Sequence, residues 1–306
     1  MTQPGIPNDY AISTSCYGNR LRTIEDQAFA SVAMGFRRLE FGLSESPVPL
    51  NGFEDSRRET GIAVGSMVAG CLDPRREHMS GSQLASLKNE LRECALGSVR
   101  RHARIALHYG CPVVILRGFE VEDAALTLRA RSLHTRLQLG QPGEELREEG
   151  AALIAEIEKK AHKQAEHLCR SIHTLCTEYP DITFAIEPGF DFADLLTHET
   201  VGWVFSELQR YKVAYWHDTG RTHQRAKLGS PAHGEWLDAY ASRMVGVHLQ
   251  DAIDTEVEMP PGAGEVDFGL VKSYLSPTAE RVVEIQPSHG RAEILGAIRF
   301  LLDKGF

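Results

Sequence analysis

The stretches Val113-Val114-Ile115-Leu116 and Met244-Val245-Gly246-Val247 decide the fold class, because both are short, apolar and uninterrupted by charge. Strands that are buried on both faces have this pattern, since the helices that connect parallel strands cover both faces of their sheet. Each run belongs to a repeating pattern in which polar or Gly residues follow, and then a longer stretch with apolar residues at helical spacing. The two runs therefore predict parallel strands in an α/β fold.

The alternation of a short apolar run and a helical pattern occurs eight times. The predicted strands cover residues 10–15, 36–41, 62–68, 113–116, 183–187, 213–218, 244–248 and 282–285. The predicted helices cover residues 23–34, 49–59, 82–109, 144–179, 197–210, 232–242, 268–275 and 291–304. Eight such units in 306 residues match a (β/α)8 barrel in size. No linker rich in Pro, Gly or Ser divides the chain, so residues 1–306 are expected to form a single TIM-barrel domain.

An open, doubly wound sheet is the alternative α/β architecture. Its nucleotide-binding first turn carries G-x-G-x-x-G, whereas residues 13–20 read STSCYGNR, without that motif and without a Walker lysine. The barrel is therefore favoured. Residues 118–143 are irregular and rich in charge, and in a barrel they are expected to form a long loop over the face that carries the active site.

Composition limits the partners of the chain. It has 33 Lys and Arg against 42 Asp and Glu, a formal net charge of -9, so its field should repel polyanions and no nucleic-acid partner is expected. No apolar stretch reaches the length of a membrane span, and the first residues lack the pattern of a signal sequence. A cytoplasmic protein with no membrane partner is expected. The six cysteines occur singly, which predicts reduced core thiols.

Residue types that bind metals occur at the ends of the last four predicted strands. These residues are Glu187, Asp218, His248 and Glu284. Successive members are about one strand–helix unit apart, so in a barrel all four would lie at one height on the C-terminal rim. Each alone would fit a turn, a helix cap or a core histidine. Their recurrence in four successive units favours convergence on one cation.

Three carboxylates and one imidazole are a suitable donor set for a divalent ion. Without a cation, three converging carboxylates would repel one another strongly. The oxygen-rich set suits Mn2+, Mg2+, Co2+ or Zn2+, and it has too few thiolates or imidazoles to favour copper or a cluster. Manganese is the ion we expect, with the other three also compatible.

The second half of the chain resembles the xylose-isomerase-like TIM-barrel superfamily of sugar and sugar-phosphate isomerases and epimerases, to which endonuclease IV is related. The resemblance rests on five motifs in a specific order: IEPG at 186–189, HDTG at 217–220, GVHLQD at 246–251, PGAGEVDF at 261–268 and VVEI at 282–285. The first half is similar only in its strand–helix rhythm.

The resemblance implies roles for the four strand-end residues. Glu187, Asp218, His248 and Glu284 would hold one divalent ion, and the two glutamates would form the acid–base pair. The ion would bind a ketose carbonyl and a neighbouring hydroxyl while one glutamate takes a proton from the adjacent carbon. Such a cation offsets charge on the enediolate oxygen, and carboxylates on opposite sides of the carbon can remove and return a proton on either face.

The sequence departs from the family pattern close to this site. Many relatives carry a His soon after the Asp of the HDTG-type motif, where this chain has Arg221. They also carry a second Asp-x-His or Asp-His before the Pro-Gly turn, where this chain has Glu258 and Met259. The accessory ligands of a three-metal nuclease site are missing, so AP endonuclease activity is not expected.

Four residues are expected to contact the substrate: Glu40, Arg221, His223 and Asp251. Glu40 ends the second predicted strand and is suited to bind hydroxyl groups, or to a structural role at the rim. The basic residues from 221 to 227 fit either a clamp for an acidic substrate group or a solvated loop.

The sequence thus predicts a metal-dependent isomerase or epimerase of a sugar, a sugar phosphate or a related polyol. A dehydratase at the same site is the first alternative, because both reactions begin with the same proton abstraction. A non-catalytic barrel that binds a polyol is the second, suggested by the altered residues near the site. The expected partner is a small carbohydrate, and the sequence leaves homo-oligomerisation open.

Overall fold

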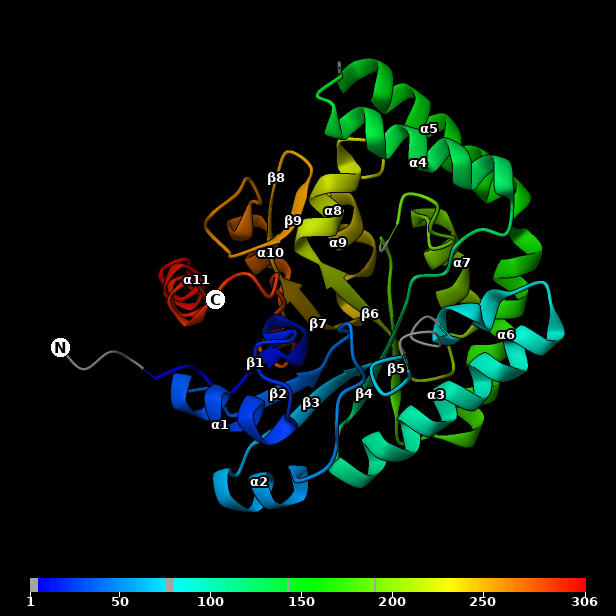
Figure 1. Ribbon diagram of the computed structural model, residues 1–306. Helices are drawn as coiled ribbons and strands as arrows, with labels where there is room; N and C mark the ends of the chain where they lie inside the picture. The colour runs from blue at the N-terminus through cyan, green and yellow to red at the C-terminus, as the bar shows by residue number, and fades with distance from the viewer. Residues whose placement is uncertain (1–4, 75–79, 142, 190) are drawn as a thin grey trace.

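Eight parallel strands form a closed barrel in the computed structural model, which describes residues 5–74, 80–141, 143–189 and 191–306 (Figure 1). Their bounds are β1 Tyr10–Ser13, β2 Arg38–Phe41, β3 Ala63–Val68, β4 Val113–Arg117, β5 Thr183–Glu187, β6 Val213–Asp218, β7 Met244–Leu249 and β10 Glu280–Val283. The order around the barrel is β1, β10, β7, β6, β5, β4, β3 and β2, and every neighbouring pair is parallel. The predicted (β/α)8 architecture is confirmed.

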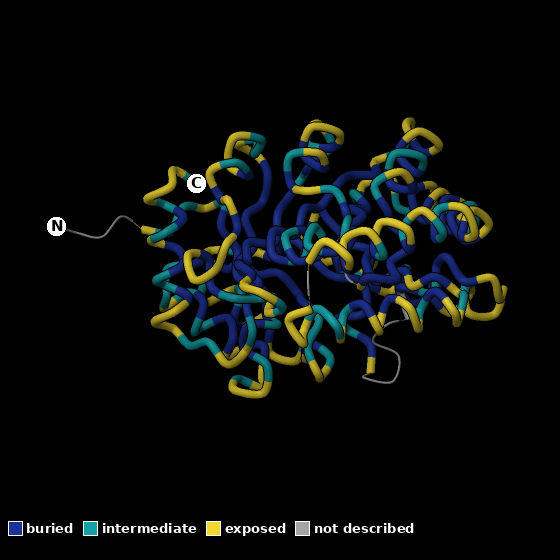
Figure 2. Tube along the Cα trace, turned by 90° about the horizontal axis from the view of Figure 1, so that it is seen from above, coloured by how far each residue is buried: buried dark blue, intermediate teal, exposed yellow. Residues whose placement is uncertain are grey.

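Helices connect the strands and surround the barrel (Figure 1). Those that match the predicted segments are α1 Ile24–Met34, α2 Phe53–Thr60, α3 Asn89–Tyr109, α5 Gly143–Lys160, α6 His162–Glu178, α7 His198–Glu207, α9 His233–Tyr240, α10 Phe268–Tyr274 and α11 Arg291–Asp303. In α6, Leu168, Ile172 and Leu175 are buried at helical spacing, because one face of the helix packs inward. Figure 2 shows the result for the whole chain, with buried segments inside and exposed turns of helix outside.

Residues 118–143 do not form the long loop that the sequence suggested. They contain α4 (Ala124–Gln138), which begins after Asp123, whose carboxylate accepts hydrogen bonds from the first backbone N–H groups of the helix. α4 packs against α5 (Gly143–Lys160), and the pair lies at one edge of the molecule (Figure 1). The charged residues that suggested a loop form ion pairs between α4 and α5. Arg136 Nη1, for example, lies 2.7 Å from Glu149 Oε2. Residue 142 of the predicted loop lies outside the described residues.

Other boundaries also differ from the prediction. Residues 144–179 form two helices, α5 and α6, separated at Ala161. The apolar spacing continues across this residue without Gly or Pro, so the sequence does not mark the break. Residues 82–109 begin in a 3-10 segment, η3 (Ser80–Ala85), before α3. The basic residues after β6 belong to a helix, α8 (Thr219–Ala226), and β7 is followed by an antiparallel hairpin, β8 (Asp251–Ile253) with β9 (Glu256–Met259).

Packed side chains fill the barrel interior. Trp216 of β6 is completely buried there, in a cluster with Ala11, Val282 and other apolar residues. Gly246 of β7 provides the space for the indole, because a Cβ at this position would lie 2.3 Å from a ring carbon of Trp216. The Trp216 ring also lies 5.2 Å from the imidazole ring of His248, measured between centroids, so the apolar core supports the polar end of the barrel.

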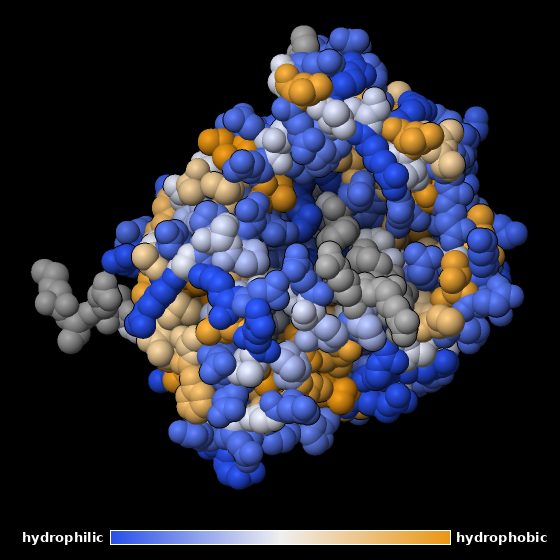
Figure 3. All heavy atoms as spheres, in the orientation of Figure 1, coloured by the Kyte–Doolittle hydropathy of each residue, from blue (hydrophilic) through white to orange (hydrophobic). Residues whose placement is uncertain are grey.

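Hydrophilic residues cover most of the face shown in Figure 3, with smaller hydrophobic areas between them. No helix within the described part of the chain is both long and apolar enough to cross a membrane. All six cysteines are free thiols. Five are buried, but Cys94 is exposed on α3, so the prediction of core thiols is wrong for that residue.

Candidate metal centre

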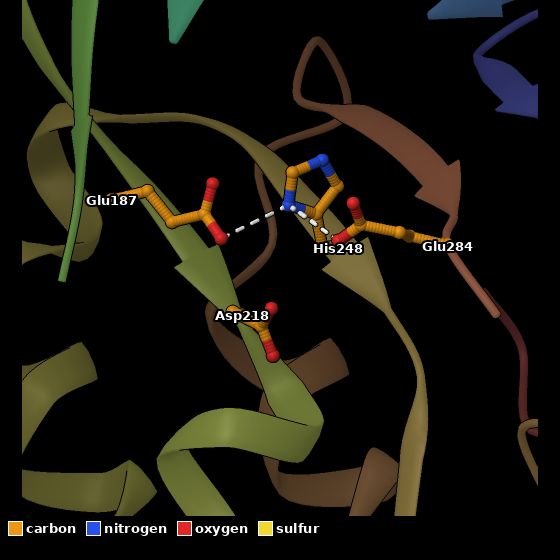
Figure 4. Close-up of side chains that lie close together, drawn as sticks. All are labelled: Glu187, Asp218, His248 and Glu284. Carbon is orange, nitrogen blue, oxygen red and sulfur yellow. Dashed lines mark ion pairs between the residues drawn. The ribbon is translucent and has the colours of Figure 1, made fainter. Parts of the chain in front are cut away.

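Four side chains converge at the C-terminal end of the barrel (Figure 4). Glu187 ends β5, Asp218 ends β6, His248 is next to last in β7, and Glu284 follows β10 directly. The strand register places Asp218 directly beside His248, and Glu284 lies two residues beyond Val282, the partner of His248 on β10. All four side chains are buried, and one ligand atom of each lies within 4.8 Å of those of the others.

The imidazole of His248 is aimed between the two glutamates. Its Nδ1 lies 3.3 Å from Glu187 Oε1 and 3.4 Å from Glu284 Oε2 (Figure 4), and this buried nitrogen has no hydrogen-bond partner of good geometry among the described residues. On the other side of the ring, Nε2 lies 2.9 Å from Glu40 Oε2, which also accepts a hydrogen bond from Ser66 Oγ at 2.9 Å. A proton on Nε2 leaves the Nδ1 lone pair for a ligand, as in carboxylate–histidine–metal arrangements.

These residues fit a divalent cation. The donor set combines three carboxylates with one imidazole nitrogen that is buried and lacks a hydrogen bond of good geometry. Oxygen-rich sites with a single nitrogen suit hard or borderline divalent ions such as Mn2+, Mg2+ and Zn2+.

Hydrogen bonds from two segments hold the Asp218 carboxylate in place: the start of α8, which follows β6, and Gln250, which follows β7. As the N-cap of α8, its Oδ1 accepts a hydrogen bond from Arg221 N at 2.8 Å. Its Oδ2 accepts a second one from Gln250 Nε2, also at 2.8 Å. Gln250 Oε1 in turn accepts a hydrogen bond from Glu258 N at 2.7 Å, so the β8–β9 hairpin is tied to the same carboxylate.

Glu258 has an unusual backbone conformation beside the centre. Its φ of +59° is in the left-handed region, which residues other than Gly adopt infrequently. Hydrogen bonds hold it there, from its N–H to Gln250 and from Gln286 N to its carbonyl oxygen at 2.8 Å. In this position its carboxylate forms an ion pair with Arg221, whose Nε also lies 3.4 Å from Asp218 Oδ2.

Arg117, the last residue of β4, also enters the cluster. Its Nη1 lies 3.1 Å from Glu187 Oε1 and 3.2 Å from Glu284 Oε2, and its Nη2 lies 3.0 Å from Glu284 Oε1. The side chain is only 3% exposed. Sequence reasoning missed this residue because the predicted fourth strand ended at Leu116. One more residue would have put a charged side chain at the strand-end position that identified the other four.

The cations around Glu187 and Glu284 keep both carboxylates ionised. Burial alone would raise their pKa values. The charges of Arg117 and His248 outweigh burial, so both pKa values lie below the usual range for glutamate. Both side chains are therefore anionic at neutral pH, as a metal ligand or a general base must be.

His248 and Asp218 are shifted in the opposite direction. Burial opposes a charge on His248, but the carboxylates of Glu284, Glu40 and Glu187 outweigh it and raise the pKa of the imidazole well above its usual value. For Asp218 burial dominates and raises the pKa to about 7, although the charge of Arg221 acts against it. Asp218 can therefore exchange its proton for a metal ion near neutral pH, and His248 has to give up a proton to become a ligand.

A cavity of about 920 Å³ lies beside the cluster and is large enough for a small molecule. Arg117, Glu284, Arg221 and Glu258 line it next to the centre. Other polar lining residues are Ser15, Asn19, Arg20, Ser44, Glu45 and Ser288.

The structure brings one of the four residues predicted to contact the substrate, Arg221, to this cavity. Glu40 is fully buried against His248 and does not line the cavity. His223 lies on α8 with Nε2 3.4 Å from Glu265 Oε2 and is not one of the residues that line the cavity.

Asp251 anchors the Gly-rich turn that follows the hairpin. Its Oδ1 accepts hydrogen bonds from Ala252 N at 2.9 Å and Val266 N at 3.0 Å, and its Oδ2 accepts one from Gly262 N at 2.9 Å. The side chain is buried, so these backbone contacts account for both of its oxygens.

The chain has the fold of the xylose-isomerase-like TIM-barrel proteins. It is similar to 3-keto-D-glucoside 4-epimerase from E. coli, with a TM-score of 0.65 and 13% identity, over 97% of this chain and 100% of that chain. It is also similar to the IolI protein with bound zinc, with a TM-score of 0.59 and 11% identity over 97% and 96% of the chains. Endonuclease IV from Thermus thermophilus matches with a TM-score of 0.55 and 14% identity over 97% and 98% of the chains.

In sequence comparisons, no family model matches the chain and no curated protein matches it at a significant level. The structural likeness therefore defines the fold, which supports many chemistries. The reaction has to be argued from the site.

Proposed function

We propose that this protein is a divalent-metal-dependent isomerase or epimerase that acts on a sugar, a sugar phosphate or a related polyol. The observation that carries the proposal is the convergence of three buried carboxylates on a buried imidazole nitrogen beside a polar cavity. The similarity to a 3-keto-D-glucoside 4-epimerase supports the same class of reaction.

Glu187, Asp218, His248 and Glu284 would hold the ion. When bound, it supplies a Lewis acid that polarises a substrate carbonyl and a neighbouring hydroxyl. Glu40 keeps the imidazole of His248 turned toward the site, and Gln250 together with the start of α8 fixes the Asp218 carboxylate. We expect manganese, and zinc is the ion bound to the IolI protein.

The two glutamates are placed to move a proton. They approach the same imidazole nitrogen of His248 from two directions, Glu187 from β5 and Glu284 from the end of β10 (Figure 4). Each is ionised, so either can take a proton from the carbon next to a carbonyl, and the one that has taken it can return it. Two carboxylates on different sides of one carbon allow return to the opposite face, which is epimerisation.

The cavity supports a carbohydrate as substrate. Ser15, Asn19, Ser44 and Ser288 offer hydroxyl and amide groups that can bind sugar hydroxyls, and Arg221 with Glu258 offers a charged pair close to the centre. DNA is a poorer match. The net charge of -9 opposes binding of a polyanion. Within the described residues, the cluster has four ligand-type side chains, which suit one ion and not the three-metal site of a nuclease.

The test is proton exchange at the substrate carbon. The metal-loaded protein is incubated in heavy water with a panel of ketoses, aldoses and keto-glycosides, and the products are identified by NMR. The proposal predicts an isomer or epimer with solvent deuterium at the carbon next to the carbonyl. Loss of water with formation of a deoxy-keto product would instead identify the dehydratase alternative.

The acid–base pair is tested on the same assay with Glu187→Gln and Glu284→Gln. Each variant keeps an oxygen ligand but loses the base, so turnover should fall by about 10²- to 10⁴-fold. Glu178→Gln, which removes a surface carboxylate of α6, is the matched control and should keep wild-type turnover. Unchanged turnover in both active-site variants would refute the acid–base assignment. Absence of turnover by the metal-loaded wild type on the whole substrate panel would favour a non-catalytic binding barrel.

A further inference from the structure

We propose that Arg117 is an internal cation of this centre, which competes with the divalent ion for Glu187 and Glu284 and so sets the affinity of the site for metal. The inference rests on the metal centre proposed above. It adds a residue that the family resemblance does not assign.

Arg117 and the imidazole of His248 lie beside the same two carboxylate oxygens. Arg117 Nη1 lies 3.1 Å from Glu187 Oε1 and 3.2 Å from Glu284 Oε2. His248 Nδ1 lies 3.3 Å and 3.4 Å from the same two atoms. A metal ion bound to His248 Nδ1 and to these oxygens would therefore need the oxygens that the guanidinium now contacts.

The guanidinium cannot share the site with a second cation without cost. It keeps its proton at every relevant pH and has donors only, so it cannot itself become a ligand. Arg117 and both glutamates are almost fully buried, with side chains 1% to 3% exposed, so repulsion between the guanidinium and a divalent ion is weakly screened. A metal ion at these oxygens therefore competes with Arg117 for the two carboxylates.

The cavity provides a place for the displaced guanidinium. Arg117 forms part of the wall of the cavity of about 920 Å³. The same wall carries the carboxylates of Glu45 and Glu258, the second of which is 30% exposed. A small rotation of the long side chain would therefore move its charge from the metal centre into the space where a substrate would bind.

The experiment compares Mn2+ binding by four proteins after treatment with a chelator. They are the wild type, Arg117→Met, Arg117→Lys and the control Arg100→Met. Arg100 also binds a glutamate, Glu178, with Nε 2.7 Å from Oε2, but it lies on the surface. Affinity is measured by calorimetry, and thermal unfolding is recorded with and without Mn2+.

Arg117→Met should bind Mn2+ about 10- to 100-fold more tightly than the wild type, because the ion no longer has to break charge-assisted hydrogen bonds. Without metal this variant should unfold at a lower temperature than the wild type, and Mn2+ should raise its midpoint by more. Arg117→Lys should lie between the two, since an ammonium group cannot bridge both carboxylates in the same way. Arg100→Met should match the wild type.

Equal or weaker binding by Arg117→Met would overturn the proposal, because it would mean that Arg117 only orients the glutamates or only supports the fold. If Arg117→Met does not fold, Arg117→Lys decides, and affinity no higher than that of the wild type refutes the inference. Absence of Mn2+ binding by the wild type would overturn the metal centre itself. The wild-type titration thus separates the two failures.

Discussion

Glu280 is a buried carboxyl group whose pKa is raised, in contrast to Glu187 and Glu284, whose pKa values are lowered by neighbouring cations. It begins β10, and its side chain is 6% exposed. Burial raises its pKa to about 7, although the Arg38 guanidinium, 3.3 Å away, acts against the shift. Gly65 of β3 provides the space for it, because a Cβ there would lie 1.5 Å from Glu280 Oε1.

The raised pKa predicts that Glu280 destabilises the folded protein as the pH rises. The unfolded chain releases this proton near pH 4.5 and the folded protein near pH 7, so within that window the folded state binds more protons and the free energy of unfolding falls with pH. Glu280→Gln stays neutral and should lack this fall. Relative to the wild type, it should gain about 2 to 3 kcal/mol between about pH 5 and about pH 8.

Denaturant unfolding of both proteins at these two pH values measures the difference. The comparison cancels the groups whose ionisation does not depend on Glu280, while Glu40 and His248, whose charges act on Glu280, contribute only through that interaction. A difference in stability that is the same at both pH values would show that Glu280 ionises normally in the folded state.

The sequence identifies individual residues of the site unevenly. The four proposed ligands are visible because each is a polar residue that interrupts or ends an apolar run. Arg117 also ends an apolar run, but the predicted strand stopped at residue 116, one residue before it. The contact of Glu40 with His248 joins β2 to β7, and a long-range contact of this kind depends on the barrel, not on any local pattern.

At the scale of elements, the fit of β7 against Trp216 supports the metal centre from below. Gly246 and His248 lie on the same side of β7, and the indole of Trp216 occupies the space beside both. Packing in the barrel core and orientation of the imidazole are therefore linked through one aromatic side chain.

Gly246→Ala should disturb both properties. Its Cβ would meet the Trp216 ring at 2.3 Å, and such overpacking typically costs about 1 to 3 kcal/mol. Because the indole also contacts His248, Mn2+ affinity should fall as well. Chemical denaturation and metal titration measure the two effects.

Gly97→Ala is the matched control. Gly97 lies inside α3, and apart from the neighbouring turns of its own helix no atom of the described residues lies within 4 Å of an added Cβ, so this change should stabilise the protein by up to about 1 kcal/mol. A neutral effect of Gly246→Ala on both stability and metal binding would show that the indole can move freely and does not support the imidazole.

The elements themselves were predicted where the pattern is strong. All eight barrel strands follow from short apolar runs, because a parallel strand must be buried on both faces. α4 was missed because its buried residues are spaced among arginines that bind to α5, so the charge suggested solvent contact. α8 was missed because it is short and polar, and it depends on Asp218 as its cap.

At the scale of the whole molecule, the closed barrel brings residues from distant parts of the sequence to one end. Strands β2, β4, β5, β6 and β7, and the residue directly after β10, each contribute a charged or ligand-type side chain to a single buried network. The order of the strands could be inferred from eight similar units. The balance of charge between the arginines and the carboxylates could not, since it depends on which side chains the closed barrel brings into contact.

The central claim is that Glu187, Asp218, His248 and Glu284 bind one divalent ion, and metal content by mass spectrometry tests it most directly. The protein is loaded with Mn2+, freed of excess ion and compared with Asp218→Asn, His248→Ala and the control His173→Ala, which changes an exposed histidine of α6. The account predicts about one equivalent per chain in the wild type and the control, and loss of the ion in the other two variants. A wild type that takes up no ion, or site variants that retain it, would contradict the account.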